Sequence, residues 1–388
     1  MSKVLLLSEI FPPEPGGSGR WFFESYRRIQ SAECLMAVGN HADAHVFDEA
    51  NRDLEIMRLD LHMPFRGVTS LASLSQYGQR VKTIRKLART NNCNQIHAAR
   101  PLFEGLVAKL VSMTSGIPYL CYVHGEDVSV AKTSRELTAL TNWTLRSAKA
   151  LIANSDFTRS MLENEWGIAA DRIRTINPGV DTNYFQPAQR STQTRDELGW
   201  NDRPVVLTVG RLQARKGQDT LIKALPKIIE RIPKVLYAVV GDGEQHDELV
   251  ALTKQLQLQE HVVFHREISD AALLDCYQQC DLFCLPNRQI GADVEGFGMV
   301  LLEAQSCGKP VIAGASGGTA ETLEDGKTGH VVDCREPEAV GALVAELLLD
   351  RERASKMGEM GRQRICNRFD WQVVATQSAN LFASVVSK

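Results

Sequence analysis

Residues 295–312 read Glu-Gly-Phe-Gly-Met-Val-Leu-Leu-Glu-Ala-Gln-Ser-Cys-Gly-Lys-Pro-Val-Ile, so two carboxylates, Glu295 and Glu303, bracket a Gly-Phe-Gly turn. Glycine lets a backbone approach a ligand closely. A turn that opens a helix presents free N–H groups to an anion, and carboxylates accept hydrogen bonds from hydroxyls. We expect Glu295 just before the helix and Glu303 about two turns into it, on nearly the same side. The stretch predicts a site for a ligand with hydroxyls and phosphate; the alternative is a capped helix with a surface acid.

Working outward from this stretch, short apolar runs alternate with helical patterns along the chain. Such alternation predicts parallel sheets covered by helices on both faces. The alternation restarts after a polar, turn-rich segment between Asn177 and about Arg203. Two series predict an α/β chain with two Rossmann-like domains. The expected strands are residues 4–7, 34–38, 45–47, 95–98, 119–123 and 150–153, then 204–209, 235–240, 262–264, 282–285, 310–313 and 329–331.

The bulk composition is typical of a soluble enzyme with two domains. The chain has 388 residues, of which 44% are hydrophobic and 23% charged. No apolar run approaches the length of a membrane span, and residues 1–10 read as a buried strand instead of a signal peptide. The nine cysteines have no paired spacing. Together these features predict a protein of the reducing cytoplasm.

Basic residues concentrate between Asp60 and Glu104, where no acid occurs. Residues 77–89 predict a helix with an apolar stripe surrounded by basic side chains. A basic amphipathic helix can lie on an anionic membrane surface; the alternative is an ordinary surface helix that packs its stripe on the sheet. Nucleic acid is a weaker option and is not the expected partner, because aromatic interleaving is lacking. The stripe consists of Val81, Ile84 and Leu87, and the basic side chains proposed to contact the membrane are Arg80, Lys82, Arg85 and Lys86.

Ligands of open α/β sheets lie beyond the carboxyl ends of the strands, so the loops there are where chemistry is expected. The loop after residues 204–209 reads Gly210-Arg-Leu-Gln-Ala-Arg-Lys-Gly217. Two cations, Arg211 and Lys216, flank a turn that leads into a helix. They predict a site that holds a diphosphate and stabilises it as a leaving group. Neighbouring Arg215 is expected to be solvated or to cap the turn.

Two further loops carry candidate residues. Gly16 and Gly17 follow the first strand and can bring backbone amides against a phosphate; a plain tight turn explains them equally well. His124 follows the strand at residues 119–123 and is placed to reach into an interdomain cleft. Its alternative is a packed or capping histidine. No metal site is predicted at His124, because ligand partners are missing around it.

In the second half, Ile268 follows the strand at residues 262–264 and is a candidate for backbone contacts with a nucleotide base. Cys276, Cys280 and Cys284 are spaced four apart, and buried thiols are favoured there over a metal site. The loop at residues 314–319 can touch phosphate, but support of the neighbouring helix is the favoured interpretation.

Taken together, these motifs resemble the retaining glycosyltransferases of family four, over almost the whole chain. The resemblance implies the GT-B architecture, in which two Rossmann-like domains face each other across an interdomain cleft. Within the family, the chain is similar to phosphatidylinositol mannosyltransferases and related bacterial enzymes. It departs from the family pattern at Ser18-Gly19-Arg20 and at Arg266. The motifs are Glu295-x7-Glu303, Val209-Gly-Arg-Leu through Lys216-Gly217, Val240-Gly-Asp-Gly, Pro-Pro-x-x-Gly-Gly near the N-terminus, His124-Gly and Ser316-Gly-Gly-x-x-Glu321.

The resemblance also implies roles for single residues. Arg211 and Lys216 would bind the donor diphosphate, with Gly16 and Gly17 approaching the phosphates. Glu303 would accept hydrogen bonds from the ribose, and His124 would contact the donor sugar near its reacting carbon. Ile268 would contact the base. Glu295 would bind hydroxyls of the transferred sugar with help from the amides of Phe297, Gly298, Met299 and Val300.

From these roles we expect a cytoplasmic enzyme, peripheral at the inner membrane face, that moves a hexose with retention of configuration and without a metal or cofactor. The preferred donor is GDP-mannose, and the acceptor is a lipid-linked or glycan hydroxyl. The alternatives are a UDP-sugar transferase (glucose or N-acetylglucosamine), a nucleotide-sugar 2-epimerase and a non-catalytic nucleotide-sugar binder. Residues 1–187 form the expected acceptor domain, 188–366 the donor domain, and 367–388 a helix that packs back on the first domain. Acceptor contacts are expected from residues 11–20, 60–75 and 100–104.

Overall fold

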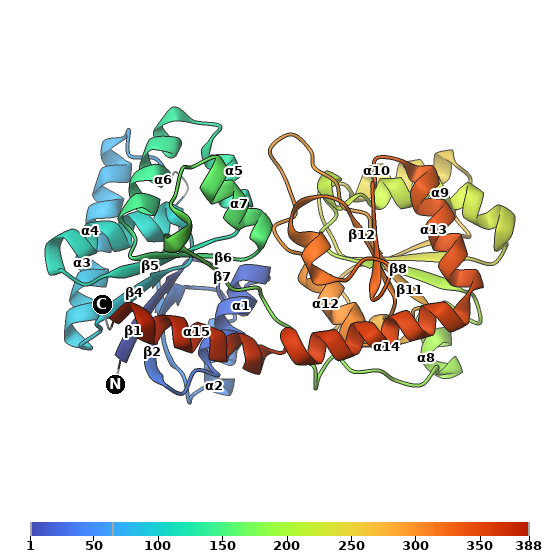
Figure 1. The fold of residues 1–388 in the computed structure, drawn as a ribbon, viewed down its shortest axis with the longest axis horizontal. Helices are drawn as coiled ribbons and strands as arrows, with labels where there is room; N and C mark the ends of the chain where they lie inside the picture. Colours follow the sequence, from blue (N-terminus) through green and yellow to red (C-terminus); the bar gives the residue numbers. More distant parts are fainter. Residues whose placement is uncertain (1, 64–65, 387–388) are drawn as a thin grey trace. The chain divides into compact units, whose positions relative to one another are not determined.

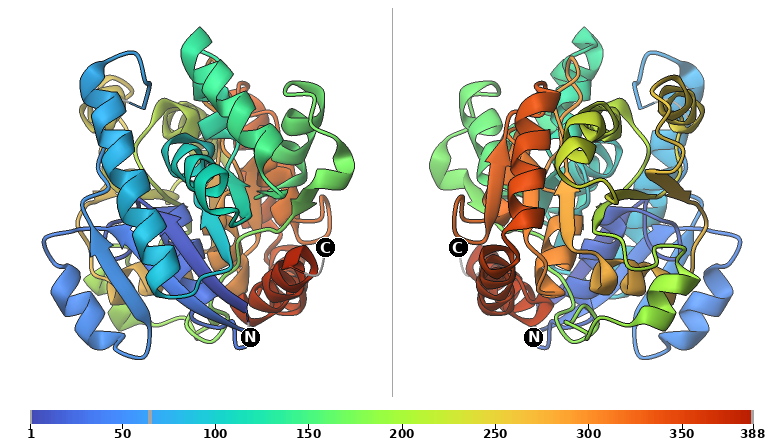
Figure 2. Two further views of the ribbon diagram at one scale, coloured as in Figure 1. Left: turned by 90° about the vertical axis from the view of Figure 1, so that its left-hand side faces the viewer. Right: turned by 90° about the vertical axis from the view of Figure 1, so that its right-hand side faces the viewer.

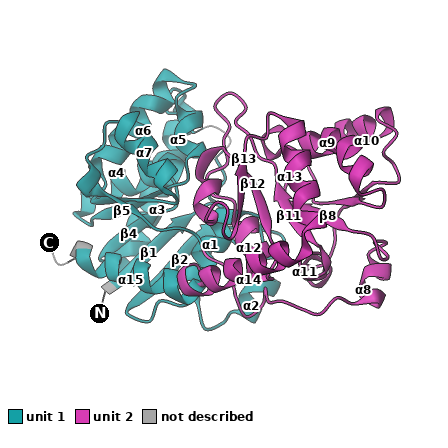
Figure 3. Cartoon of the chain, turned by 45° about the vertical axis from the view of Figure 1, so that its right-hand side comes forward, with its two compact units in different colours: residues 1–178, 371–388 teal, residues 179–370 magenta. Residues whose placement is uncertain are grey.

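The structure is a computed structural model that describes residues 2–63 and 66–386. Residues 64–65, part of an expected acceptor loop, lie outside the described residues. The chain divides into two compact units (Figure 3): unit 1 is Met1–Pro178 with Trp371–Lys388, and unit 2 is Gly179–Asp370. Each unit has one parallel sheet with helices on both faces (Figures 1 and 2), which confirms the predicted α/β class and two Rossmann-like domains.

Unit 1 has a seven-stranded sheet in the order β3-β2-β1-β4-β5-β6-β7. All paired strands run parallel. The strand order reverses between β1 and β4, the point where ligands of such sheets bind beyond the carboxyl ends. The strands are β1 (Ser2–Ser8), β2 (Ala32–Gly39), β3 (Glu55–Leu59), β4 (Gln95–Ala98), β5 (Tyr119–Val123), β6 (Ala150–Ala153) and β7 (Ile173–Thr175).

Side chains of β1 alternate between the two faces of this sheet, as the period of a strand requires. Leu5 and Leu7 belong to a core shared with α3, α4, α6 and α7, while the C-terminal helix α15 lies against α1. The helical segments are α1 (Gly17–Tyr26), α2 (Ala44–Ala50), α3 (Leu71–Thr90), η1 (Pro101–Gly105), α4 (Leu106–Ser115), α5 (Glu126–Ala131), α6 (Arg135–Ser147), α7 (Asp156–Asn164), η2 (Ala170–Arg172) and α15 (Trp371–Val386).

The prediction of a strand at residues 45–47 is wrong, because these residues lie in α2. Phe47 instead packs its ring against Phe11 and Phe23, with centroids 6.3 and 5.0 Å away. The third strand is β3, which was not predicted. As an edge strand it pairs only with β2 and is partly exposed, so its sequence lacks the apolar run that marks a central strand. The short edge strand β7 was missed as well.

Unit 2 has a six-stranded sheet in the order β10-β9-β8-β11-β12-β13, again with all paired strands parallel. The strand order reverses between β8 and β11, so the loops after these two strands leave the sheet side by side. The strands are β8 (Val205–Val209), β9 (Leu236–Val240), β10 (Val262–His265), β11 (Leu282–Leu285), β12 (Val311–Gly314) and β13 (Gly329–Val332).

Two apolar cores cover the two faces of this sheet. Val205, Leu207 and Val209 pack with α11, α12 and α14, whereas Val206 packs with α9, α10 and α13. The helical segments are α8 (Thr192–Glu197), η3 (Ala214–Lys216), α9 (Gln218–Arg231), α10 (His246–Gln255), α11 (Asp270–Gln279), α12 (Met299–Ser306), η4 (Gly317–Thr322), α13 (Pro337–Leu349) and α14 (Arg351–Arg368).

The units divide earlier than the predicted domain boundary at residues 187 and 188. Val180 N donates to Phe369 O at 2.8 Å, and Phe185 is buried in a core of unit 2. The segment after Pro178 therefore packs with the second sheet. Turn-forming residues in the sequence indicate that a linker is present, but packing decides with which of the two units the linker associates.

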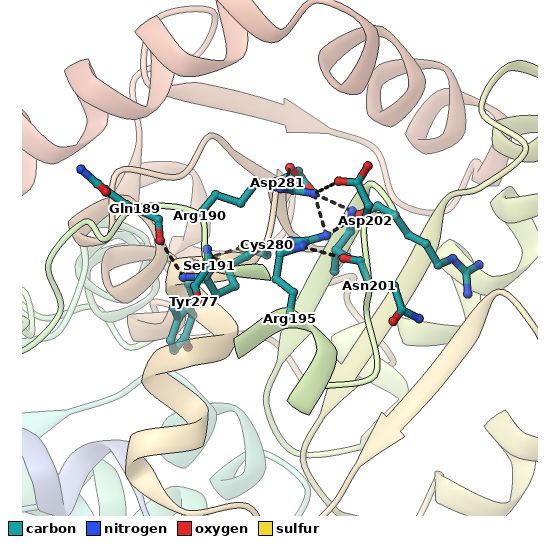
Figure 4. Close-up of polar contacts among 12 residues, drawn as sticks. Gln189, Arg190, Ser191, Arg195, Asn201, Asp202, Tyr277, Cys280 and Asp281 are labelled. Atoms are coloured by element: carbon teal, nitrogen blue, oxygen red, sulfur yellow. Dashed lines mark hydrogen bonds and ion pairs between the residues drawn. The ribbon is translucent and has the colours of Figure 1, made fainter. Parts of the chain in front are cut away.

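A buried arginine fastens the rest of this linker to the amino end of β8 (Figure 4). The Arg195 side chain is 1% exposed and donates only to backbone carbonyls. Nε donates to Asn201 O at 2.9 Å, and the two Nη atoms donate to Gln279 O and Arg203 O. One side chain thus holds three carbonyls, two from the loop at residues 201–203 and one from the end of α11.

Asp281, which directly precedes β11, completes this tie. Its Oδ2 accepts from Val205 N at 2.8 Å and lies 3.8 Å from Arg195 Nη2. Its Oδ1 lies 2.8 Å from Arg190 Nη1, and Arg190 Nη2 lies 3.3 Å from Asp202 Oδ1. The contacts join the linker to the first residue of β8.

Candidate active site

The loop between β8 and α9 carries the two predicted cations. It ends at Gly217, whose φ of 73° is left-handed and whose Cβ, if present, would lie 1.8 Å from Pro286 O. Only glycine fits there. The loop is thereby pressed against the segment after β11, and Lys216 is 8% exposed at its end.

Lys216 and Glu295 form an ion pair, with Nζ 2.6 Å from Oε2. Arg215 Nη1 contacts the same carboxylate oxygen. Burial alone would raise the pKa of Glu295, but the charges of Lys216 and Arg215 outweigh it and leave this pKa below its ordinary value. Glu295 is therefore an ionised, partly buried carboxylate, suited to accept hydrogen bonds from hydroxyls.

Arg211 lies in different surroundings from Lys216. Its side chain is exposed and forms no ion pair with a described residue, while its backbone oxygen accepts from Gln218 Nε2 at 3.3 Å. The loop therefore offers one cation held by a carboxylate and a second cation with an open guanidinium. The second is the better placed of the two to meet an incoming anion.

The helix between the two glutamates is shorter than its sequence pattern predicts. Helix α12 begins at Met299, after Gly298 with a φ of 90°. A Cβ on Gly298 would lie 3.0 Å from Thr319 Cγ2. Glu303 consequently stands one turn into the helix, not two. The first-turn amides of Met299 and Val300 have no acceptor inside the helix and can receive an anion.

Glu303 is 5% exposed, and its Oε2 accepts a hydrogen bond from Tyr277 Oη at 2.6 Å. Phe297 is a core residue, 3% exposed, so only its backbone is available to a ligand. Ile268 is partly buried and packs against the same core. The prediction assigned Phe297 and Ile268 backbone contacts, and these placements are compatible with such contacts.

The loop after β12 supports the backbone at Glu295. Gly318 N donates to Glu295 O at 3.0 Å. Gly317 has a φ of 70°, and a Cβ there would lie 1.9 Å from Glu295 O. Asn287 holds the same loop by accepting from Gly314 N at 3.0 Å and donating to Ser316 O at 2.8 Å. This supporting role agrees with the prediction for residues 314–319.

In unit 1, His124 follows β5 at the carboxyl edge of the sheet. Nε2 lies 2.9 Å from Ala99 O, and the rings of Trp21 and Phe22 lie 5.6 and 5.9 Å away in edge-on contact. Burial, reinforced by the charge of Arg100, lowers the pKa of His124 to about 3. The ring is therefore neutral. Because a carbonyl only accepts, Nε2 carries the proton and Nδ1 keeps its lone pair as an acceptor.

Gly16 and Gly17 stand exposed at the start of α1. The φ of Gly16 is 171°, an extended conformation open to any residue. Space is what restricts this position, since a Cβ on Gly16 would lie 3.0 Å from Ile10 Cγ2. Next to them, Ser18 Oγ accepts from Arg100 Nη2 at 3.1 Å.

The predicted membrane-binding set on α3 is wrong for Arg80. This side chain is 8% exposed and donates from Nη2 to His62 O at 2.8 Å. The apolar stripe is also taken up inside unit 1, because Ile84 is fully buried and Val81 and Leu87 pack beside it. Lys82 and Lys86 remain exposed, and Arg85 is half-buried.

Cys276, Cys280 and Cys284 are buried, free thiols, as predicted. Burial raises the pKa of Cys276 and Cys280 to about 12. Within residues 2–63 and 66–386, no three His, Cys, Asp or Glu side chains gather as a group that could hold a metal ion. No described helix is both long enough and apolar enough to span a membrane.

Sequence reasoning missed the contribution of Arg215. It was expected to be solvated or to cap a turn, whereas its side chain is 12% exposed, with Nε 3.0 Å from Asp293 Oδ1. Tyr277 and Asn287 were missed too. Of these three residues, only Arg215 had a signal in the sequence. Residues 215–216 are two cations and residues 293–295 include two carboxylates, and the two runs lie on loops that follow neighbouring strands.

Comparison with known proteins covers both units. Residues 15–184 match the family Glycosyltransferase Family 4, and residues 190–364 match the family Glycosyl transferases group 1. The chain is 38% identical, over 98% of each chain, to a GDP-mannose-dependent alpha-(1-6)-phosphatidylinositol monomannoside mannosyltransferase of Mycolicibacterium smegmatis. It is 33% identical, again over 98% of each chain, to the protein of the same name from Mycobacterium tuberculosis.

Solved structures show the same fold. HepE of Anabaena, crystallised with UDP and glucose, matches with a TM-score of 0.81 and 23% identity, over 99% of this chain and 100% of HepE. Sucrose-phosphate synthase of Thermosynechococcus elongatus matches with a TM-score of 0.79 and 21% identity, over the full length of both chains. At these identities the likeness concerns the fold alone.

Proposed function

Because this chain belongs to the glycosyltransferases of group 1 and family 4 and has the GT-B fold, we propose that it transfers mannose from GDP-mannose to a hydroxyl of a lipid-linked or glycan acceptor. The observation that carries the choice of donor is the likeness to mannosyltransferases named as GDP-mannose-dependent, at 38% and 33% identity over 98% of each chain. Those names also describe a phosphatidylinositol mannoside acceptor, which makes a mannosylated glycolipid our first candidate acceptor.

The geometry of unit 2 supports a nucleotide-sugar donor. The open guanidinium of Arg211 and the first-turn amides of α12 would receive the diphosphate. Lys216 would neutralise charge at the departing phosphate, and Glu303, held by Tyr277, would accept from the ribose hydroxyls. Glu295 would accept from hydroxyls of the mannose.

We propose transfer with retention of configuration by attack on the front face of the sugar. The bond from the anomeric carbon to the phosphate oxygen breaks while the bond to the acceptor oxygen forms, and the leaving phosphate oxygen takes the acceptor's proton. No protein base is required for this step. His124, neutral with Nδ1 as an acceptor, would orient a donor-sugar hydroxyl, and fixed cations would replace a metal ion at the phosphate.

We further propose that exposed basic side chains of α3 attract the enzyme to an anionic membrane, where a lipid acceptor lies. The attraction is electrostatic, because the apolar stripe is used in the core. Replacing Lys82 and Lys86 together by glutamine should reduce co-sedimentation with vesicles that contain anionic lipid. Co-sedimentation with neutral vesicles should not change. Equal sedimentation of wild type and variant would remove this part of the proposal.

Calorimetric titration tests the donor assignment. The wild type is titrated with GDP, UDP and ADP, and with GDP-mannose and UDP-glucose, in the presence of EDTA. Selective binding of GDP and GDP-mannose supports the proposal, and selective binding of UDP and UDP-glucose overturns the choice of donor. Binding to none of them overturns the proposed function while the fold stands.

Transfer is then measured with radiolabelled GDP-mannose and mannosylated glycolipid. Sensitivity of the product to α-mannosidase tests retention, since GDP-mannose is itself an α-glycosyl phosphate. A β-linked product, or activity that EDTA abolishes, would contradict the mechanism. Conversion of the donor without any acceptor would favour an epimerase.

A further inference from the structure

We propose that Arg215 is a positioning residue that, together with Asp293, orients Glu295 toward a hydroxyl of the donor sugar and supplies its permanent counter-ion. The inference deepens the proposed function and rests on it, because it takes Glu295 as the group that meets the transferred sugar.

The geometry places one guanidinium across two carboxylates of the same loop. Arg215 Nε lies 3.0 Å from Asp293 Oδ1, and its Nη1 contacts Glu295 Oε2. Lys216 Nζ also approaches Glu295 at Oε2, at 2.6 Å. No described residue donates a hydrogen bond to Oε1 of Glu295. Both cations therefore hold one oxygen of this carboxylate and leave the other for a hydroxyl.

The chemistry of the two cations differs. A guanidinium is a rigid planar fork that fixes the orientation of what it binds, whereas a lysine ammonium is a point charge on a flexible stem. Arg215 is also the more constrained of the two, because it pairs with Asp293 and its own carbonyl accepts from Arg288 N at 2.8 Å. Orientation of Glu295 is therefore assigned to Arg215.

Charge balance indicates that Arg215 also serves as the counter-ion of Glu295. Arg215, Lys216, Asp293 and Glu295 carry two positive and two negative charges. If Lys216 turns its charge to the donor diphosphate, Glu295 still needs a cation, because an uncompensated buried carboxylate is costly. Arg215 can remain in place and supply it, so Lys216 is available to the phosphate.

The tie between the two loops agrees with such a role. Asp293 belongs to a tight turn in which its N and O atoms pair with Ile290 at 2.9 and 3.0 Å. Arg288, from the same segment, lies 2.8 Å from Asp219 at the start of α9. Arg215 thus joins the loop that carries Lys216 to the loop that carries Glu295.

The test compares a nucleotide with the corresponding nucleotide sugar. Calorimetry of Arg215→Met should show GDP-mannose affinity about tenfold weaker and a clearly smaller loss of GDP affinity, because GDP lacks the sugar that Glu295 meets and depends on Arg215 only through Lys216. Arg215→Lys should restore part of the loss by returning the charge without the fork. The GDP-mannose affinity of Asp293→Asn should lie between the affinities of Arg215→Met and wild type.

The matched control is Arg335→Met, which removes another arginine of unit 2 that pairs with an aspartate, Asp333, at an exposed site. It should leave both affinities unchanged. Equal weakening of GDP and GDP-mannose in Arg215→Met would overturn the proposal in favour of direct diphosphate binding. Affinities like those of Arg335→Met would reduce Arg215 to a packing role. If Arg215→Met does not fold, Arg215→Lys and Asp293→Asn replace it. The same comparison then decides, namely the loss of GDP-mannose affinity relative to the loss of GDP affinity.

A pH profile separates positioning from packing. The charged groups that face Glu295 are Arg215 and Lys216 from the β8–α9 loop and Asp293 from its own loop. Removing Arg215 takes away one of the cations that lower the pKa of Glu295, so the acid side of the kcat/KM profile should move to higher pH. Asp293→Asn should not move it upward; an upward shift there, or none in Arg215→Met, contradicts the proposal.

Failure of the proposed function has a different signature. Wild type that binds UDP-glucose and not GDP-mannose overturns the donor assignment, and the UDP and UDP-glucose pair then replaces the GDP pair in the same comparison. A sugar-dependent loss in Arg215→Met would sustain the inference in that case too.

Discussion

Unit 2 holds two clusters of charged side chains at opposite ends of β8 and β11. The amino-end cluster ties the linker to the first residue of β8, and the carboxyl-end cluster lies in the loops that follow the two strands. Their composition is nearly the same, with two cations and two carboxylates each. The amino-end cluster is Arg190, Arg195, Asp202 and Asp281, and the carboxyl-end cluster is Arg215, Lys216, Asp293 and Glu295.

The two clusters differ in where their hydrogen bonds go. Arg195 gives its donors to backbone carbonyls, and such contacts hold segments of chain together. In the carboxyl-end cluster, side chains pair with side chains beside glycines that have no room for a Cβ, and one oxygen of Glu295 stays open. The same balance of cations and carboxylates therefore builds a structural tie at one end of the sheet and a candidate binding site at the other, where ligands of such sheets bind.

The largest effect that distinguishes the clusters is on stability. Arg195→Met should lower the free energy of unfolding by about 3 kcal/mol, because three carbonyls lose their donor and the Asp281 carboxylate loses one of its two cations. Urea-induced unfolding measures this, with Arg335→Met as the exposed control that should show no measurable change. Donor affinity of folded Arg195→Met should equal that of wild type; weaker donor binding would break the distinction.

At the carboxyl end, the largest effect should be on turnover. Lys216→Met should reduce kcat about a hundredfold, the scale of one electrostatic stabiliser of a leaving group. Lys227→Met, on the exposed side of α9 where Lys227 pairs with Glu230, is the control and should keep wild-type turnover. Near-normal turnover in Lys216→Met would remove Lys216 from the reaction.

Donor affinity should change less. Glu303→Gln should weaken GDP and GDP-mannose binding alike, by about tenfold, because the ribose belongs to both ligands. Tyr277→Phe should produce a smaller loss, roughly threefold, since it removes only the partner of Glu303. Calorimetry measures both. A loss confined to GDP-mannose would assign Glu303 to the sugar instead of the ribose.

The smallest effect concerns His124 in unit 1. Its pKa of about 3 in the folded chain lies below the ordinary value of 6.5. The unfolded chain therefore binds a proton that the folded chain lacks, so stability from neutral His124 is present above pH 6.5 and lost as the pH falls toward 3. Between about pH 7.5 and about pH 5.5, wild type should lose about 1 kcal/mol more unfolding free energy than His124→Gln.

If wild type and His124→Gln lose the same unfolding free energy over this pH range, His124 has the same pKa in the folded and the unfolded chain, which contradicts the prediction. His97 serves as an internal reference because its burial lowers its pKa to about 3 as well. It is retained in both proteins, so its contribution cancels in the difference.

The sequence predicted central strands well and edges poorly. Buried strands such as β5 and β8 are continuous apolar runs, because both their faces are covered by helices. The edge strand β3 mixes charged and apolar residues, and residues 45–47 turned out to be helical. Propensity and local pattern do not report whether a strand has one neighbour or two.

The residues of the candidate site likewise fall into those that the sequence predicted and those that it did not. The sequence pattern predicted Lys216 in a loop after a strand and Glu295 just before a helix, but it placed Glu303 one turn too far into that helix. The burial of Arg80 and the ion pairs of Arg215 were not predicted, because each depends on segments distant in sequence. Arg80 finds a carbonyl 18 residues away, and Arg215 finds its carboxylate 80 residues away.

By itself, the sequence determined the α/β class, the two domains and the loops that carry charge, since periodicity and glycine positions are local properties of the chain, and its motifs resembled the family that the comparisons then showed. Only the tertiary structure decided which cation meets which carboxylate, which arginine is buried and where the linker packs. Those outcomes depend on the strand order, which brings the loops after β8 and β11 together, and on burial, which gives an ion pair its strength.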